Sequence, residues 1–129
     1  MNRLAHRVFL FAGIYGLIVL IPQLFSESRI AHDYPPAITH SEYFYGFIGI
    51  AIAWQLCFLL IARDPARYRA FMLPAMVEKL AFGVPSIFLF AQHRLPGITM
   101  TFAMFDLVLL ALFVAAYRST SVVDDVWPR

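Results

Sequence analysis

Four long apolar runs divide this chain, and each is long enough to form one membrane-crossing helix. The charges inside the runs are limited to Glu78, Lys79 and Asp106, and the runs cover residues 8–26, 43–62, 70–92 and 95–117. A helix needs about 20 mainly apolar residues to cross a bilayer, and its backbone groups must be hydrogen-bonded internally. The pattern therefore predicts one all-α domain over residues 1–129 with four transmembrane helices, the fourth starting near Gly97 after the Pro96-Gly97 turn.

Short connections and the distribution of arginine predict how these helices are arranged. The second and third connections are short, so consecutive helices are expected to be antiparallel neighbours. Basic residues concentrate in the cytoplasmic segments of membrane proteins. The two terminal segments and the second connection together hold seven arginines, whereas the first and third connections hold two. We therefore expect an antiparallel four-helix bundle with both termini cytoplasmic.

Prolines and small residues predict local features of the helices. The first connection, residues 27–42, is expected to be the longest non-helical segment, and Asp33-Tyr34-Pro35-Pro36 to be extended within it. Pro85 lies well inside the third run and is expected to kink that helix. Small residues four positions apart allow helix backbones to approach closely, and they occur as Ala12 and Gly16, Gly49 and Ala53, and Ala111 and Ala115.

The composition supports a membrane protein and excludes several other classes. Apolar residues make up 61% of the 129 residues and charged residues 14%, against about 45–50% and about 25% in soluble domains. The net charge of +2 is spread thinly, which argues against a nucleic-acid-binding protein because such proteins gather basic residues on one face. Cys57 is the single cysteine, so a disulfide within one chain is excluded.

The sequence contains no familiar catalytic or nucleotide-binding motif. The first connection does contain residue types that can bind a metal ion, namely His32, Asp33, His40 and Glu42. Their spacing fits no standard metal site, so we interpret this segment as an ordinary polar loop. We therefore expect no metal and no cofactor, and the sequence leaves open whether the protein is an enzyme.

Polar residues from all four predicted helices fall at a similar depth in the membrane. At a rise of about 1.5 Å per residue from the cytoplasmic helix ends, Glu78 and Lys79 lie ~12–14 Å deep and Asp106 ~16 Å deep, while Gln55 and Tyr15 lie ~10 Å deep. A charge at the bilayer centre costs at least about 2.5–3.5 kcal/mol, so such groups normally face the bundle interior and pair. This layer is the candidate functional site.

Several pairings are open within this layer. Glu78 and Lys79 point about 100° apart on a helix, so they are not expected to be partners of each other. In one arrangement Lys79 pairs with Asp106 across the bundle, and Glu78 is left to Gln55, Tyr15 or a water molecule. In another, Glu78 pairs with a neighbouring chain. We expect one carboxyl group to be ionised and the other protonated.

The layout resembles that of the DoxX-like group of small bacterial four-helix membrane proteins. The shared features are the chain length, four helices with short turns, and an acidic residue within the last helix, here Asp106. Four segments also resemble an uncharacterised family of the bacterial inner membrane, namely residues 42–47 (EYFYGF), 62–65 (ARDP), 67–69 (RYR) and 76–79 (MVEK). The resemblance implies a multi-pass protein of the inner (plasma) membrane, but it assigns no activity and no catalytic residue.

These observations support three hypotheses about function. The first is a polar pocket within the membrane that binds a small lipophilic molecule such as a quinone or a lipid. The second is an accessory subunit whose buried charges dock a helix of a membrane-protein partner. The third is a small proton-coupled transporter, functioning as a homo-oligomer. The residues expected to line the pocket are Glu78, Lys79 and Asp106, with Gln55, Tyr15 and Trp54 as its walls.

Overall fold

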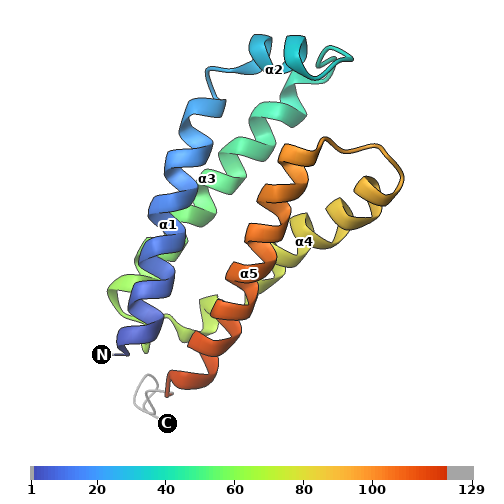
Figure 1. The fold of residues 1–129 in the computed structure, drawn as a ribbon. Coiled ribbons are helices and arrows are strands. Elements are labelled where there is room, and N and C mark those ends of the chain that lie inside the picture. The colour runs from blue at the N-terminus through green and yellow to red at the C-terminus, as the bar shows by residue number, and fades with distance from the viewer. Residues whose placement is uncertain (1, 122–129) are drawn as a thin grey trace.

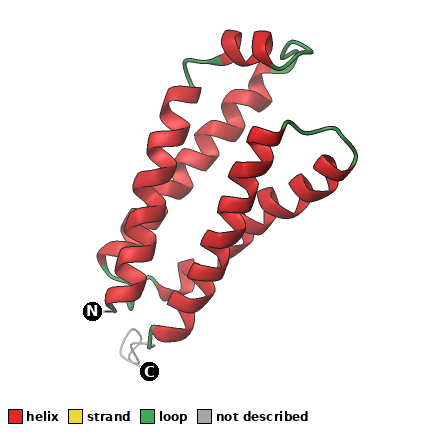
Figure 2. Ribbon diagram, in the orientation of Figure 1, coloured by secondary structure: helices red, strands yellow, loops and turns green. Residues whose placement is uncertain are grey.

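The computed structural model describes residues 2–121, and within that range the chain is all helical, with no strand (Figure 1, Figure 2). It contains four long helices, one short helix and one turn of 3₁₀ helix. In chain order these elements are α1 (Arg3–Gln23), α2 (Glu27–Asp33), α3 (Ser41–Arg63), η1 (Arg69–Phe71), α4 (Met72–Ala91) and α5 (Gly97–Ser119). Arg129, which contributes to the arginine count above, lies outside the described residues.

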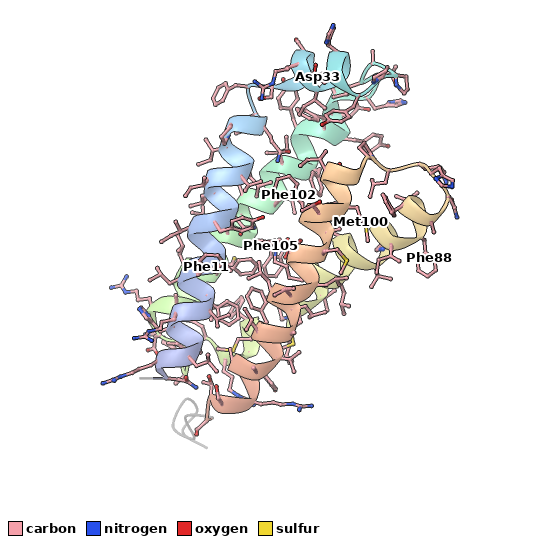
Figure 3. The ribbon with its side chains drawn as sticks, viewed as in Figure 1. Phe11, Asp33, Phe88, Met100, Phe102 and Phe105 are labelled. Carbon is pink, nitrogen blue, oxygen red and sulfur yellow. The ribbon has the colours of Figure 1, made fainter. Side chains whose placement is uncertain are left out.

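Four of the helices are long and apolar enough to cross a membrane, as the sequence predicts. They are α1, α3, α4 with the preceding turn η1, and α5, each with 21 or 23 residues. At about 1.5 Å per residue, such helices exceed the ~30 Å thickness of the hydrocarbon core. Large apolar side chains cover the outside of the molecule, and Phe88, which is 63% exposed, points away from the bundle (Figure 3).

The four long helices form two closely packed pairs (Figure 1). Helix α1 packs along α3, and α4 packs along α5, while the two pairs meet mainly through α1 and α5. The contact between α3 and α4 is much shorter. It includes Phe47 and Phe82, whose ring centroids lie 6.1 Å apart. One side of the bundle is therefore less tightly closed than the others.

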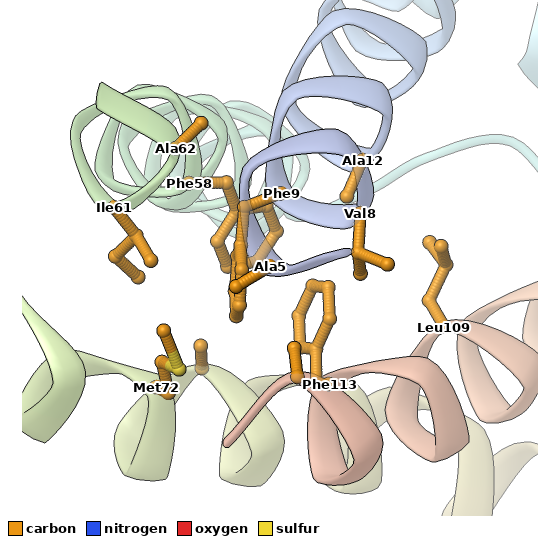
Figure 4. Close-up of a cluster of buried hydrophobic side chains, with 12 residues drawn as sticks. Ala5, Val8, Phe9, Ala12, Phe58, Ile61, Ala62, Met72, Leu109 and Phe113 are labelled. Carbon is orange, nitrogen blue, oxygen red and sulfur yellow. The ribbon is translucent and has the colours of Figure 1, made fainter. Parts of the chain in front are cut away.

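The core that joins the two pairs is built from aromatic rings (Figure 4). Phe9 of α1 stacks on Phe113 of α5 with centroids 4.2 Å apart, and Phe58 of α3 meets the edge of Phe113 at 5.1 Å. All three side chains are fully buried, and Met72 of α4 adds to the same cluster. Offset-stacked and edge-to-face aromatic pairs stabilise a structure beyond the area that they bury.

Polar contacts join the two ends of the described chain. Asn2 caps α1, because its Oδ1 accepts hydrogen bonds from the backbone N–H groups of Leu4 and Ala5 at 3.0 and 3.2 Å. The Nδ2 of Asn2 also donates to the backbone oxygen of Ser119 at 2.7 Å. The beginning of α1 and the end of α5 therefore lie at the same end of the molecule (Figure 1).

Two glycines allow α1 and α3 to approach closely. A Cβ atom at Gly16 would lie 2.0 Å from Oε1 of Gln55, and one at Gly13 would lie 2.7 Å from Cδ2 of Leu59. Of the three small-residue pairs in the sequence, only Ala12 and Gly16 are buried. The other two pairs lie on exposed positions of α3 and α5, so the expected close packing is wrong for them within this chain.

The first connection is not a purely extended loop, and that expectation is wrong for residues 27–33. These residues form α2, which ends just before Pro35 and Pro36, where the chain can no longer continue a helix. The α2 carboxylate of Glu27 accepts hydrogen bonds from the hydroxyl groups of Ser41 at 2.5 Å and Tyr45 at 2.7 Å. These bonds attach the start of α2 to the start of α3. In α4, the helix continues on both sides of Pro85.

Enlarging Gly16 should destabilise the protein, because the new side chain would collide with Gln55. We expect Gly16→Leu to lower the free energy of unfolding by about 1–3 kcal/mol, as overpacking does in other interiors. Thermal unfolding in detergent micelles, followed by circular dichroism, measures the effect. Gly49→Leu is the matched control on α3, where a Cβ atom meets nothing within 4 Å. Equal losses in both variants would contradict the assigned α1–α3 interface.

The attachment of α2 should depend on pH. The hydrogen bonds from Ser41 and then Tyr45 hold the pKa of Glu27 below its ordinary value of 4.5. A lowered pKa in the folded state means that the attachment is fully present above that ordinary value and is lost as the pH falls through the folded-state pKa. Hydrogen exchange should therefore show α2 better protected in the wild type than in Glu27→Gln at pH 6, with the difference shrinking as the pH is lowered below 4.5. A difference that persists at low pH would exclude this role for Glu27.

Candidate functional site

Three charged side chains meet in the interior of the α4–α5 pair. Lys79 Nζ lies 3.1 Å from Oδ1 of Asp106, to which it donates a hydrogen bond, and 3.2 Å from Oε2 of Glu78. The side chain of Lys79 is 5% exposed, that of Asp106 15% and that of Glu78 17%. We call Glu78, Lys79 and Asp106 the charged triad. It consists of two carboxyl groups that share one ammonium group.

The helical spacing of α4 and α5 explains why the triad is buried. The buried residues of α4 are spaced by three or four, with Lys79 in the middle of the row, which is Met72, Ala75, Lys79, Gly83 and Ser86. On α5, Asp106 lies three residues from buried Ala103 and three from buried Leu109. The two residues therefore face each other between the helices. Glu78 points about 100° away from Lys79 around the axis of α4 and lies at the edge of this row.

Helix α3 contributes an aromatic ring to the triad. Lys79 Nζ lies 5.2 Å from the ring centroid of Phe58, within the distance at which a cation is attracted to the face of an aromatic ring. The same ring belongs to the aromatic core with Phe9 and Phe113. The sequence analysis does not identify Phe58, because nothing in the pattern distinguishes it among 13 phenylalanines. Its position connects the charged triad with the packing of all four long helices.

The triad is not balanced in charge or in hydrogen bonds. One ammonium group neutralises one carboxylate, and a second uncompensated charge in a low-dielectric interior is costly. Lys79 donates its hydrogen bond to Asp106. Among residues 2–121, Oε2 of Glu78 is the buried side-chain polar atom that has no hydrogen-bond partner. Oε2 nevertheless lies 3.2 Å from Lys79 Nζ, so Glu78 is the carboxyl group of the triad that has an ion-pair contact but makes no hydrogen bond among residues 2–121.

The predicted pairing is partly confirmed. Lys79 and Asp106 do pair across the helices. The expectation that Glu78 and Lys79 are not partners is wrong in terms of distance, because the long lysine side chain brings its ammonium group within 3.2 Å of the adjacent carboxylate. The Cβ directions diverge as expected, but four rotatable carbon bonds allow Lys79 to reach both acids.

Gln55 does not join the triad. Its Nε2 donates to the backbone oxygen of Ala51 at 2.9 Å, and its side chain packs against Gly16. Gln55 is 2% exposed, so it is a packing residue of the α1–α3 interface. The arrangement in which Gln55 is the partner of Glu78, one of the three left open by the sequence, is not the one found, because depth along a helix does not determine the direction around it.

Tyr15 and Trp54 lie near the triad through aromatic neighbours. The ring of Tyr15 in α1 stacks on that of Phe105 in α5, with centroids 5.2 Å apart. Phe105, which is labelled in Figure 3, is the residue before Asp106 in the sequence. Trp54 packs beside Phe58, with centroids 6.3 Å apart. Tyr15 and Trp54 are half-buried and border the aromatic core. Both residues are therefore neighbours of the site, and neither forms a hydrogen bond with a charged group of the triad.

Two hollows of the surface lie outside the triad. One, of about 350 Å³, follows α1 and is lined by Arg7, Leu10, Phe11, Ile14, Tyr15 and Ile18. The other, of about 270 Å³, lies at the turn after α3 and is lined by Arg63, Asp64, Arg67 and Tyr68. Neither is lined by a residue of the triad. The charged triad is therefore not part of either hollow.

Comparison with known proteins gives no match: no protein-family model, no curated protein and no solved structure is similar to this chain.

The pairing of Lys79 with Asp106 should appear in a double-mutant cycle. Removal of one partner from a buried ion pair costs about 3 kcal/mol, because it leaves the other charge uncompensated. We expect Lys79→Met and Asp106→Asn each to lower stability by about that amount, and the double variant to recover much of the loss. Chemical unfolding of the detergent-solubilised protein measures the three changes. Glu78→Gln is the matched control, since it leaves the pair intact, and additive losses would contradict the pairing.

Proposed function

We propose that this chain is a multi-pass protein of the bacterial inner membrane, with antiparallel helices, both termini cytoplasmic and a DoxX-like layout. Three observations support this arrangement. The four long helices are apolar enough to cross a bilayer. The contact between Asn2 and Ser119 joins the beginning of α1 and the end of α5. The arginine-rich segments are the two terminal segments and the second connection, and such segments concentrate on the cytoplasmic side.

We further propose that the charged triad binds a small lipophilic molecule within the membrane. The observation that carries this proposal is the buried Oε2 of Glu78, which has no hydrogen-bond partner among residues 2–121. A buried polar atom without a partner costs free energy, and a ligand that supplies one is favoured by the same amount. Lys79 donates its hydrogen bond to Asp106 and contacts Glu78 only as an ion pair at 3.2 Å, so the hydrogen-bonding capacity of Glu78 is left for the ligand.

The chemistry of Glu78 suggests a class of ligand. A protonated carboxyl group donates a hydrogen bond to a carbonyl oxygen, as in a quinone, and an ionised one accepts from a hydroxyl group, as in a quinol or a lipid. A molecule of this kind reaches Glu78 from the bilayer, because the short contact between α3 and α4 leaves that side of the bundle less closed. Phe58 and Trp54 lie on the α3 side of this route.

Replacing Glu78 by glutamine should remove the ligand while leaving the fold intact. Glu78→Gln keeps the size of the side chain but removes the exchangeable proton and the charge. Native mass spectrometry of protein extracted gently from its own membrane should find a small molecule on the wild type that the variant lacks. Glu42→Gln is the control, since Glu42 lies at the start of α3 with a side chain that is 67% exposed. A ligand retained by both variants would contradict the role of Glu78.

The same feature supports a second candidate, a small proton-coupled transporter. A triad with two acids and one lysine holds an additional proton when it is electrically neutral. Loss of that proton would couple to transport, with Glu78 as the carrier in a homo-oligomer. The mass-spectrometry experiment separates the candidates: a bound small molecule supports the pocket, an empty protein supports the proton carrier, and a bound polypeptide supports an accessory subunit that docks a membrane partner.

A further inference from the structure

A polar hollow lies where α3 ends and the chain turns toward η1. It has a volume of about 270 Å³ and is lined by Arg63, Asp64, Arg67 and Tyr68. Arg63 is the last residue of α3 and directly follows the apolar run of that helix. In Figure 1 this turn lies at the end of the molecule that carries the beginning of α1 and the end of α5. The hollow is separate from the charged triad and plays no part in the proposed pocket.

The turn holds the hollow in a defined shape. Oδ1 of Asp64 accepts a hydrogen bond from the backbone N–H of Arg67 at 3.2 Å, and the backbone oxygen of Asp64 accepts one from the N–H of Tyr68 at 3.0 Å. Pro65, which directly follows Asp64 in the sequence, is fully buried. The guanidinium carbon of Arg67 lies 5.6 Å from the ring centroid of Tyr68, which limits the directions that this side chain can take.

Within the part of the chain that the structure describes, the two arginines of the hollow are available to bind an anion. Both are exposed, and neither lies within ion-pair distance of a carboxylate anywhere in residues 2–121. Arg69 differs, because it donates to the backbone oxygen of Thr120 and covers the ring of Tyr117. Two guanidinium groups and the carboxylate of Asp64 give the hollow a net charge of +1.

We propose that this hollow binds the phosphodiester group of an anionic phospholipid. One guanidinium group can donate two parallel hydrogen bonds to two oxygens of a phosphate group, a geometry that the ammonium group of lysine cannot match. The single net positive charge fits a diester, which carries one negative charge, better than a monoester, which carries nearly two. The hollow follows the end of an apolar helix, which places it at the level of lipid headgroups. The inference goes beyond the proposed ligand pocket and depends only on the helices crossing the membrane.

Lipid retention by arginine variants tests the proposal. The protein is reconstituted in mixed micelles with phosphatidylglycerol and phosphatidylcholine, and native mass spectrometry measures the lipids retained. We expect the wild type to prefer phosphatidylglycerol, and Arg63→Gln and Arg67→Gln each to reduce that preference about fivefold, the usual contribution of one basic residue near a membrane surface. Arg94→Gln is the matched control, an arginine in the α4–α5 connection that donates to Gln92, and it should retain the wild-type preference.

A variant that should retain more lipid than the wild type excludes misfolding as the cause of the losses in the arginine variants. Asp64→Asn keeps the oxygen that accepts from Arg67 but raises the net charge of the hollow to +2, so it should retain more phosphatidylglycerol than the wild type. The proposal is overturned if both lipids are retained equally, or if Arg94→Gln loses as much as Arg63→Gln. It is also overturned if inorganic phosphate alone displaces the lipid, which would make free phosphate the ligand.

Discussion

The packing of this bundle depends on the interactions of one buried group, the ammonium group of Lys79. A lipid bilayer offers no hydrogen bonds and little dielectric screening, so a charge at its centre must find its partners inside the protein. Lys79 forms ion pairs with Asp106 on α5 and with Glu78 on its own helix, and it contacts the ring of Phe58 on α3. These contacts connect three of the four long helices at one depth. The aromatic core with Phe9 and Phe113 brings in the fourth.

The long helices form two closely packed pairs, and the contact between the pairs is shorter on the side of α3 and α4. Close packing of α1 on α3 depends on Gly13 and Gly16, and α4 packs along α5 around the Lys79–Asp106 ion pair. The contact between α3 and α4 is shorter than the contacts within the pairs, and we propose that lipid-soluble molecules reach Glu78 on that side. On this proposal, the carboxyl group that makes no hydrogen bond among residues 2–121 lies on the less closed side of the bundle. This coincidence supports a binding role for Glu78 over a purely structural one.

The sequence predicts the helices well, because crossing a bilayer requires only length and apolar character, and both can be read directly from the chain. It also predicts the pairing of Lys79 with Asp106, since each is a costly charge that needs an opposite one. It fails for Gln55, whose depth is right but whose direction around α3 is toward Gly16. It also misses α2, a helix of 7 residues that is too short to show an apolar period. The contact of Phe58 with Lys79 depends on tertiary packing and leaves no signal in the sequence.

The central claim is that the triad contains one carboxyl group that Lys79 does not neutralise. Infrared spectroscopy of the protein in lipid bilayers tests this most directly, because a protonated carboxyl group absorbs at a higher frequency than an ionised one. The account predicts a band from a protonated carboxyl group at neutral pH that disappears in Glu78→Gln and remains in Glu42→Gln. If the wild type has no such band, or if the band survives in Glu78→Gln, then Glu78 is not the uncompensated group and the account is wrong.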